Sequence, residues 1–377
     1  MMENPGQEPN LEHRYEAQLE EKQQRLNSLL APFNAPTVTI FPSAPEHYRM
    51  RAEFRVWHEG DDIFYIMFNS ETREKYRVEQ LPAANQLINR LMPAVLNYVR
   101  DKETLRRKLF QVDFLTTTTG EAIISMLYHK QLDEQWLLEI KQMKDEFASF
   151  GKVDFIGRAR KQKMLVDTDR VIESLQVHGR NYLFEQIENS FTQPNAQVNT
   201  KMIEWACEVT GQQTHDLLEL YCGNGNFSLP LAQNFQRVLG TEISRTSVGS
   251  AQTNIALNNI ENARVERLPA EECAAAMKGE KLPTRLQDMD LHTYDFKTVL
   301  VDPPRAGLDD DTLAMVAEFE NIVYISCNPD TLAENLVQLS RTHTITASAL
   351  FDQFPFTHHI ETGVYLQKHI DSKNTTE

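Results

Sequence analysis

The 377-residue sequence lacks the features that define several protein classes. No apolar run approaches the ~18 residues that cross a bilayer, and the acidic start MMENPGQEPNLEH has no hydrophobic segment typical of a secretory signal. Cysteine is scarce and scattered, at Cys207, Cys222, Cys273 and Cys327. Because these cysteines form no Cys-x-x-Cys pair or metal-like spacing, we expect free thiols, a reducing cytoplasm and no metal or iron–sulfur cluster.

The chain also lacks an excess of positive charge, since its formal net charge is −16. This balance argues against nonspecific binding to a polyanion, so any contact with RNA would be confined to local patches. One candidate patch is GRARKQK, residues 157–163, which holds four basic residues and no acid. The alternative is that this patch is an ordinary solvated turn beside a strand.

The N-terminal half mixes helical and strand-like patterns. Residues 11–33 predict a packing helix with an apolar stripe at Tyr15, Leu19, Leu26, Leu29 and Leu30. From about residue 36 to 187, short runs such as MRAEFRVW, LFQVDFL and AIISMLY indicate strands, with helical stretches near 84–101 and 132–149. We therefore predict an α+β domain with mainly antiparallel strands over residues 1–187.

The pattern changes near ENSFTQPN, residues 188–195, where we place the start of a second domain, 188–377. A helix predicted over 194–210 is followed by alternating helices and the strands DLLELY, VLGTEI, KTVLVDPP and NIVYIS. These strands are nearly all apolar, which is typical of a parallel sheet covered on both faces. The second domain is therefore predicted to have a Rossmann-like α/β fold with a doubly wound, mainly parallel sheet.

A glycine-containing turn in DLLELYCGNGNFSLPLA suggests a nucleoside site. Gly223 and Gly225 allow the backbone to turn tightly and to approach a ligand. The third glycine of a dinucleotide motif is missing, and Phe227 occupies that crowded space. Glu242 ends the next strand, where it can accept hydrogen bonds from both ribose hydroxyls. These features indicate S-adenosylmethionine, with a nicotinamide dinucleotide as the alternative.

Two further strands are predicted to end at the same edge of the sheet. VDPPR, residues 301–305, forms a stiff loop with Asp302 at its mouth, although an ordinary proline-rich turn is the alternative. Cys327 follows NIVYIS, so its thiol should lie beside the bound methyl donor. A buried cysteine is often only a small apolar filler, so the neighbouring residues must decide its role.

A thiol beside a methyl donor is useful if the acceptor carbon needs activation. Carbon 5 of uracil is such an atom, because it becomes nucleophilic when the Cys327 thiolate adds to carbon 6. We expect nearby donors or positive charge to favour this thiolate. A base must then remove the proton from carbon 5. Glu361 is the candidate, because burial would raise its pKa, and His358 and His359 are the alternatives.

These motifs together resemble the RNA (uracil-C5) methyltransferase family, and within it the bacterial branch that modifies tRNA. The matching segments are SFTQPN, LLELYCGNGNF, TEIS, VDPPRAGLD, YISCNP and FDQFPFTHHIE, in that order, and YRMRAEFR with LFQVDFL extends the likeness. The resemblance implies a class I methyltransferase domain preceded by an RNA-binding domain. Members that act on ribosomal RNA typically carry an extra β-barrel and a four-cysteine cluster site, neither of which is found in this sequence.

The resemblance also implies a role for individual residues. Cys327 corresponds to the nucleophile and Glu361 to the proton acceptor. The positions implied to bind S-adenosylmethionine are Gln193, Tyr221, Asn226, Glu242 and Asp302. Phe356 departs from the family pattern, in which a more polar residue is usual. The implied reaction forms 5-methyluridine at T-loop position 54 of tRNA, and a T-loop-like uridine in tmRNA is a further candidate substrate.

A T-loop uridine is buried in folded tRNA and must be extracted before the reaction. In YRMRAEFRVW, strand alternation places Arg49, Arg51, Arg55 and Trp57 on one face, which suits an RNA surface, although a solvated sheet face is the alternative. The resemblance adds Phe110 and His129 as candidates for stacking on bases. We expect the T arm of tRNA as partner; the sequence indicates no membrane contact and no protein partner.

Three other functions remain open from the sequence. A cytosine-C5 RNA methyltransferase uses similar covalent chemistry but usually needs a second cysteine, and Cys222 is the remaining cysteine at this edge. A Rossmann-type oxidoreductase would bind a nicotinamide dinucleotide instead of a methyl donor. A noncatalytic RNA-binding or RNA-remodelling protein would keep its activity when Cys327 is replaced by alanine.

Overall fold

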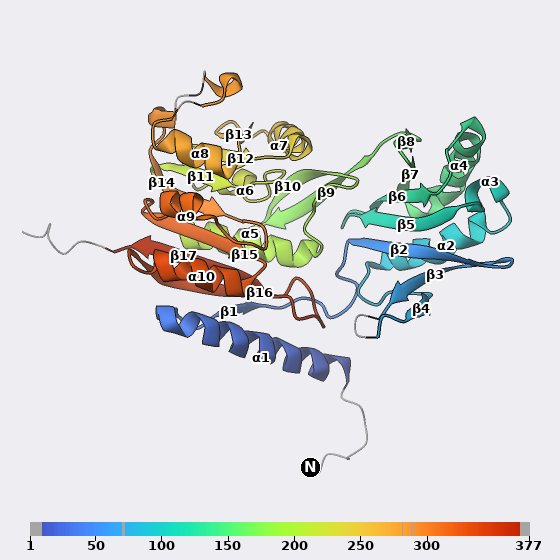
Figure 1. Ribbon diagram of the computed structural model, residues 1–377, viewed down its shortest axis with the longest axis horizontal. Helices are drawn as coiled ribbons and strands as arrows, with labels where there is room; N and C mark the ends of the chain where they lie inside the picture. The colour runs from blue at the N-terminus through green and yellow to red at the C-terminus, as the bar shows by residue number, and fades with distance from the viewer. Residues whose placement is uncertain (1–9, 70–71, 281, 288, 290, 370–377) are drawn as a thin grey trace, which may run out of the picture. The chain divides into compact units, whose positions relative to one another are not determined.

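The computed structural model describes residues 10–69, 72–280, 282–287, 289 and 291–369, and the chain folds into two compact units (Figure 1). The first unit comprises Met1–Pro45, Gln176–Phe184 and Gln197–Glu377, within the described residues. The second unit comprises Glu46–Leu175 and Glu185–Ala196. Each unit has its own sheet and its own hydrophobic core.

The first unit contains an eight-stranded sheet in the order β1-β16-β17-β15-β14-β11-β12-β13. Its strands are β1 (Thr39–Phe41), β11 (Asp216–Leu220), β12 (Val238–Glu242), β13 (Ala263–Arg267), β14 (Phe296–Val301), β15 (Asn321–Ser326), β16 (His343–Phe351) and β17 (Glu361–Lys368). The neighbours of β17 pair with it antiparallel, and the other strands pair in parallel. The predicted doubly wound, mainly parallel fold is confirmed.

Helices cover both faces of this sheet. They are α1 (Leu11–Leu30), α5 (Ala196–Thr210), α6 (Ser228–Leu231), α7 (Arg245–Leu257), α8 (Ala270–Met277), α9 (Asp310–Val316) and α10 (Pro329–Leu339), with short 3₁₀ turns at Ala31–Phe33, Thr284–Leu286 and Leu291–Thr293. Apolar side chains of α1, α8, α9 and α10 share one core with the central strands. None of the described helices combines the length and apolar character needed to cross a membrane.

The N-terminal segment belongs to the first unit, which differs from the predicted boundary at residue 187. The helix expected at 11–33 forms as α1, continued by a 3₁₀ turn, and Leu26 and Leu30 enter the core of the first unit. Strand β1 pairs in parallel with β16, with Thr39 opposite Ala349. Apolar patterning alone assigned these elements to their sequence neighbours, because it does not reveal which distant strand will pair with them.

The second unit contains a seven-stranded sheet in the order β4-β3-β2-β5-β6-β7-β8. Its elements are β2 (Arg51–Glu59), β3 (Asp62–Phe68), β4 (Lys75–Val78), α2 (Gln86–Val99), α3 (Glu103–Arg106), β5 (Leu109–Thr116), β6 (Glu121–Tyr128), α4 (Glu134–Phe147), a 3₁₀ turn at Ala148–Phe150, β7 (Lys152–Ala159) and β8 (Gln162–Leu165). All neighbouring strands are antiparallel except β6 and β7. The predicted mixture of helices with mainly antiparallel strands is confirmed.

A two-stranded ribbon of β9 (Arg170–Val177) and β10 (Arg180–Ile187) runs through the segment in which the chain passes between the units. This ribbon was not predicted from the sequence. In β9, alternate residues are buried, but one of them is Glu173. Its carboxylate accepts the Thr118 backbone N–H at 3.0 Å. A charged residue type therefore occupies a buried position at which an alternating strand pattern would place an apolar side chain.

Candidate active site

The predicted catalytic residues meet at the carboxyl edge of the first unit's sheet. Cys327 directly follows β15, and Glu361 is the first residue of β17. Ser326 lies opposite Thr362 in this antiparallel pair, so continuing the register by one residue places Cys327 opposite Glu361. Asp302 directly follows the neighbouring strand β14. The sheet therefore brings a thiol and two carboxyl groups to one edge.

Cys327 is partly exposed in a turn that local hydrogen bonds hold in place. The Asn328 backbone N–H donates to Ser326 Oγ at 3.1 Å, and the Asn328 side chain caps α10 by accepting the Asp330 N–H at 3.2 Å. Asn328 Nδ2 also donates to the backbone oxygen of Arg305 at 3.0 Å. The turn that presents the thiol is thus tied to the VDPPR loop.

The surroundings of Cys327 favour the thiol over the thiolate. Burial, together with the carboxylates of Glu361 and Asp302, raises the pKa of Cys327 to about 11, although Arg305 acts in the opposite direction. The prediction that nearby donors and positive charge favour the thiolate is therefore wrong for the protein without ligands. The reason is first that the thiol is half-buried, and second that two acidic residues and only one exposed arginine act on it.

The two carboxyl groups are themselves poor acids in this environment. Burial raises the pKa of Glu361 well above its usual range, and the charge of Asp302 raises it further. Burial also raises the pKa of Asp302 to about 7. The expected rise for Glu361 is confirmed, and it makes the carboxylate a stronger base. The alternative bases His358 and His359 are exposed to solvent, whereas Glu361 is only 7% exposed.

The glycine turn after β11 forms an open cradle at the same edge. Tyr221 has a φ of 60°, an uncommon conformation for a large side chain, and Gly223 follows with a φ of 56°. A Cβ built on Gly223 would have no atom within 4 Å, whereas one on Gly225 would collide with Leu229. The first glycine therefore leaves space above the turn, and the second permits close packing of the following helix.

Glu242 and Asn226 are already held by the protein. The Glu242 carboxylate accepts the Gly223 N–H at 3.0 Å and the Ser244 N–H at 2.7 Å, and a carboxylate has about four acceptor sites, which leaves capacity for ribose hydroxyls. The Asn226 and Asn199 side-chain amides donate to each other at 2.8 Å. These contacts fix the orientation of groups that fit a nucleoside.

Tyr221 also lies at this edge, one residue beyond the pairing of Leu220 with Thr241 and Val301. Burial raises the pKa of its phenol to about 12, and nearby acidic residues add to the effect. Tyr221 is therefore a neutral, partly buried ring beside the glycine turn, which suits contact with an uncharged part of a ligand.

Gln193 belongs to the second unit, whereas the other predicted cofactor residues belong to the first. The structure brings together the remaining four, namely Tyr221, Asn226, Glu242 and Asp302, at the edge of one sheet. Gln193 stays a prediction from the resemblance.

The RNA-binding candidates lie in the second unit. On β2, Arg55 and Trp57 are exposed and alternate with buried residues, as predicted. Arg51 is partly buried, and its guanidinium donates to the backbone oxygen of Ser190 at 2.6 Å. Arg49 lies before the strand, and its Nε donates to the Arg51 backbone oxygen at 2.7 Å. Arg55 is therefore exposed on this face, whereas Lys75 Nζ lies over the Trp57 ring, 3.6 Å from its centroid. Arg49 and Arg51 also support the local backbone.

Phe110 and His129 stack on each other with ring centroids 3.8 Å apart and planes inclined by 11°. The β5–β6 register shifts between Leu109 and Gln111, so Phe110 lies at an irregularity in the ladder. Both rings line a pocket of about 650 Å³ together with Arg158 and Arg160. The pocket therefore combines flat rings with guanidinium groups.

The basic patch at 157–163 is partly neutralised within the second unit. Arg158 Nη2 lies 2.5 Å from Glu188 Oε2, and Lys163 Nζ lies 2.7 Å from Asp169 Oδ2. Arg160 is exposed. Arg158 and Lys163 thus form ion pairs within the unit, whereas Arg160 faces solvent and is open to a phosphate or to water.

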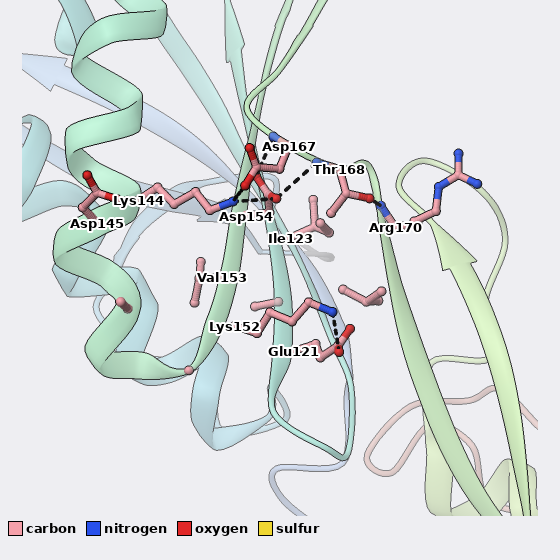
Figure 2. Close-up of a pocket in the computed structure, with 14 residues that line it drawn as sticks. Glu121, Ile123, Lys144, Asp145, Lys152, Val153, Asp154, Asp167, Thr168 and Arg170 are labelled. Carbon is pink, nitrogen blue, oxygen red and sulfur yellow. Dashed lines mark hydrogen bonds and ion pairs between the residues drawn. The ribbon is translucent and has the colours of Figure 1, made fainter.

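A second pocket, of about 440 Å³, lies beside α4, β6 and β7 (Figure 2). Lys144 extends to Asp154, at 2.9 Å, and to Asp167, while Lys152 pairs with Glu121 at 2.8 Å. Burial lowers the pKa of Lys144, but its hydrogen bonds to the two aspartates outweigh this effect and raise it. Because these charged side chains pair with one another, we assign them no catalytic role.

Glu219, a fully buried carboxyl group in β11, was not predicted as a site residue from the sequence. Burial raises its pKa to about 8, while a hydrogen bond from Ser228 opposes the rise. The signal was a charged residue inside the otherwise apolar strand DLLELY. Cys222 is buried too, and burial raises its pKa well above the usual range, which argues against it as the second reactive thiol of a cytosine-C5 mechanism.

Comparison with solved structures defines the fold class. The chain superimposes on the tRNA (uracil-54, C5)-methyltransferase of Pyrococcus abyssi, solved in complex with S-adenosyl-L-homocysteine, with a TM-score of 0.69 and 20% identity. The match covers 94% of this chain and 84% of that structure. The protein thus has the fold of a Rossmann-like methyltransferase, as the sequence predicted.

Sequence comparison then gives the family. A profile described as tRNA (Uracil-5-)-methyltransferase matches residues 14–369. A tRNA/tmRNA (uracil-C(5))-methyltransferase of Vibrio parahaemolyticus is 58% identical over 358 residues, covering 94% of this chain and 97% of the relative. Its counterpart in Colwellia psychrerythraea is 56% identical over 354 residues, with the same coverage. The chain belongs to the tRNA (uracil-5-)-methyltransferase family, and the resemblance found in the sequence is confirmed.

Proposed function

We propose that the protein transfers a methyl group from S-adenosylmethionine to carbon 5 of the T-loop uridine at position 54 of tRNA, forming 5-methyluridine. The names of its relatives support tRNA as the substrate and tmRNA as a further one. Family membership argues against a nicotinamide-dependent oxidoreductase. The proposal includes a cytoplasmic location, which the four free cysteines support.

The methyl donor would be held at the carboxyl edge of the first unit's sheet. The turn at Gly223 leaves room for a ligand, Glu242 keeps acceptor capacity for ribose hydroxyls, and Tyr221 and Asn226 lie beside the turn. S-adenosylmethionine, when bound, supplies a methyl group activated by a positively charged sulfonium. The acidic residues at this edge suit such a cation.

Cys327 activates the acceptor carbon. Its sulfur forms a bond to carbon 6 of the uracil, and the electrons of the carbon 5–carbon 6 double bond move onto the carbonyl oxygen at carbon 4. Carbon 5 is then nucleophilic and would take the methyl group as the sulfonium–methyl bond breaks, with S-adenosylhomocysteine as the leaving product. Because the thiol of the free protein has a pKa of about 11, it must lose its proton as the substrates bind.

Glu361 completes the reaction by accepting the proton from carbon 5. The electrons of that C–H bond restore the carbon 5–carbon 6 double bond, and the Cys327 sulfur leaves as thiolate. The raised pKa of Glu361 makes its carboxylate a stronger base than an ordinary glutamate. Its position opposite Cys327 in the sheet register supports this assignment.

The second unit would bind the RNA. Arg55 offers a guanidinium on the open face of β2, and Arg49 and Arg51 lie at the start of that strand. Phe110 and His129 present stacked rings in a pocket with two arginines, which suits unpaired bases and phosphates. The same proposal assigns Gln193 to the cofactor site.

The observation that carries the proposal is the meeting of Cys327, Glu361 and Asp302 at the edge that also holds the glycine turn. The test is to incubate the protein with labelled S-adenosylmethionine and unmodified tRNA, digest the RNA and identify the labelled nucleoside. We expect 5-methyluridine from wild type and none from Cys327→Ala. A tRNA carrying cytidine at position 54 is the matched control. Labelled nucleoside of any other kind, or label in the control tRNA, would contradict the proposal.

A second test addresses the two catalytic roles. With a T-arm RNA containing 5-fluorouridine, fluorine cannot leave as a proton, so we expect a stable adduct at Cys327. For Glu361→Gln with normal tRNA, a methylated protein–RNA adduct should accumulate while turnover falls. Unchanged turnover of Glu361→Gln would remove Glu361 from the mechanism.

A further inference from the structure

Helix α1 places a lysine in its buried face. The residues of α1 that are buried are Tyr15, Lys22, Leu26 and Leu30. Lys22 Nζ lies 2.6 Å from Asp352 Oδ1, and the two side chains are 5% and 0% exposed. Nζ also donates to the Phe354 backbone oxygen at 3.0 Å. A buried ion pair gives little net stability, because the cost of removing both charges from water offsets their attraction. The pair therefore contributes more through the geometry that it imposes than through stability.

A second polar contact lies one turn earlier on the same helix. Gln18 Nε2 donates to the Thr357 backbone oxygen at 2.7 Å, and Gln18 Oε1 accepts the Phe356 backbone N–H at 2.8 Å. Phe356 has a φ of 58°, which is unfavourable for an aromatic residue and requires support from its surroundings. Tyr15 packs against its ring edge-on, with centroids 5.9 Å apart.

The segment held by these contacts leads directly to the proposed base. Residues 352–360 connect the end of β16 to the start of β17, and Glu361 is the first residue of β17. Lys22 anchors the segment at Asp352 and Phe354, and Gln18 anchors it at Phe356 and Thr357. All of these residues belong to the first unit. We call residues 352–360 the base loop.

We infer that Lys22 and Gln18 are positioning residues for proton abstraction, because they hold the base loop and thereby the Glu361 carboxyl group in register with Cys327. The inference rests on the proposed function. It divides the reaction into two parts: addition of Cys327 and methyl transfer do not need Glu361, whereas release of the methylated RNA does. Loosening the base loop should therefore slow the last step selectively.

Two variants test this inference with different risks to folding. Gln18→Ala removes both of its hydrogen bonds from a partly exposed position. Lys22→Met alone would leave the buried Asp352 charge unpaired, so the useful variant is Lys22→Met combined with Asp352→Leu. Replacing a buried ion pair by apolar residues of similar size commonly preserves or increases stability. Gln24→Ala, at an exposed position of the same helix, is the control.

The assay follows two events on tRNA that carries tritium at carbon 5 of the target uridine. Methyl incorporation reports adduct formation and transfer, and tritium release reports proton abstraction. For Gln18→Ala and for the double variant, we expect kcat to fall by about 10- to 100-fold, since a shift of about 1 Å in a reacting group can have an effect of this size. Because the slowed step follows methyl transfer, KM should fall together with kcat, so that kcat/KM changes by less than about twofold, and methylated protein–RNA adduct should accumulate.

The outcomes distinguish this inference from a purely structural role and from the proposed function. If the double variant resists urea like wild type but still accumulates adduct, the base loop is positioned by these contacts. If both variants release tritium in step with methyl incorporation, as Gln24→Ala should, the positioning role is overturned while the proposed function stands. Absence of methyl incorporation and of tritium release in wild type would overturn both.

Discussion

The pH dependence of alkylation at Cys327 provides a direct test of the electrostatics of the site. Burial and the two carboxylates raise the pKa of this thiol from the usual 9.0 to about 11. At about pH 8, a pKa of 11 leaves roughly one thiol in a thousand ionised, whereas an ordinary thiol is ionised to about one part in ten. Because the thiolate is the reactive form, Cys327 should react with iodoacetamide about 100-fold more slowly than a model thiol.

The perturbation is the double substitution Asp302→Asn with Glu361→Gln, which removes both ionisable carboxyl groups, and with them any negative charge that they carry, and nearly preserves side-chain size. Replacing both residues together avoids a compensating change, because Asp302 raises the pKa of Glu361 and the loss of one carboxylate would favour ionisation of the other. Removing negative charge stabilises the thiolate, so the pKa of Cys327 should fall. Burial is the first cause of the rise and remains, so the value should stay above 9.0.

The measurement is the alkylation rate of the Cys327 peptide by mass spectrometry, from about pH 7 to about pH 9.5, without RNA or methyl donor. For wild type, the logarithm of the rate should rise in proportion to pH across this whole range, because the pKa lies above it. The double variant should react about tenfold faster at each pH, which corresponds to about one pKa unit. A wild-type plateau near pH 8, or equal rates in the two proteins, would refute this account of the site.

Three further predictions concern ligands, RNA binding and packing. S-adenosylmethionine should accelerate alkylation of Cys327 more than S-adenosylhomocysteine does, because only the former carries a positive sulfonium that favours a nearby thiolate; equal rates would contradict this. Phe110→Ala should raise the KM for tRNA by about 5- to 100-fold, the usual contribution of one stacked base, with kcat per bound tRNA changed little. Gly240→Ala would place a Cβ 2.9 Å from both Cys222 Sγ and Ser228 Oγ. It should lower the free energy of unfolding in urea by about 1–3 kcal/mol.

Much of the fold could be predicted from the sequence because the strands of the first unit are short, apolar and separated by helices. β11 and β15 are buried over nearly their whole length, which is the expected pattern for central parallel strands. The positions of α1 and β1 could not be predicted in the same way. Their partners, including β16, lie far along the chain, and an apolar stripe does not specify which surface it covers.

The sequence predicted which residues of the candidate site meet, but it did not predict the direction in which the site shifts the pKa of Cys327. Parallel strands end at one edge, so Glu242, Asp302 and Cys327 were expected together. The direction of the Cys327 pKa could not be foreseen, because it depends on how deeply the thiol is buried and on its distance to Glu361 and Asp302. Lys22 was missed for a related reason: a lysine in an apolar stripe normally extends its amine to solvent.

The raised pKa values at this edge also bear on the choice of cofactor. Burial raises the pKa of Glu219 to about 8 and that of Asp302 to about 7, and the neighbouring carboxylates reinforce the rise in Cys327. An edge with this excess of acidic groups disfavours a pyrophosphate, whose negative charges would add to the repulsion. A bound cation would instead lower all of these pKa values at once. The sulfonium of S-adenosylmethionine is such a cation, so binding of the methyl donor would favour both the thiolate nucleophile and the ionised base.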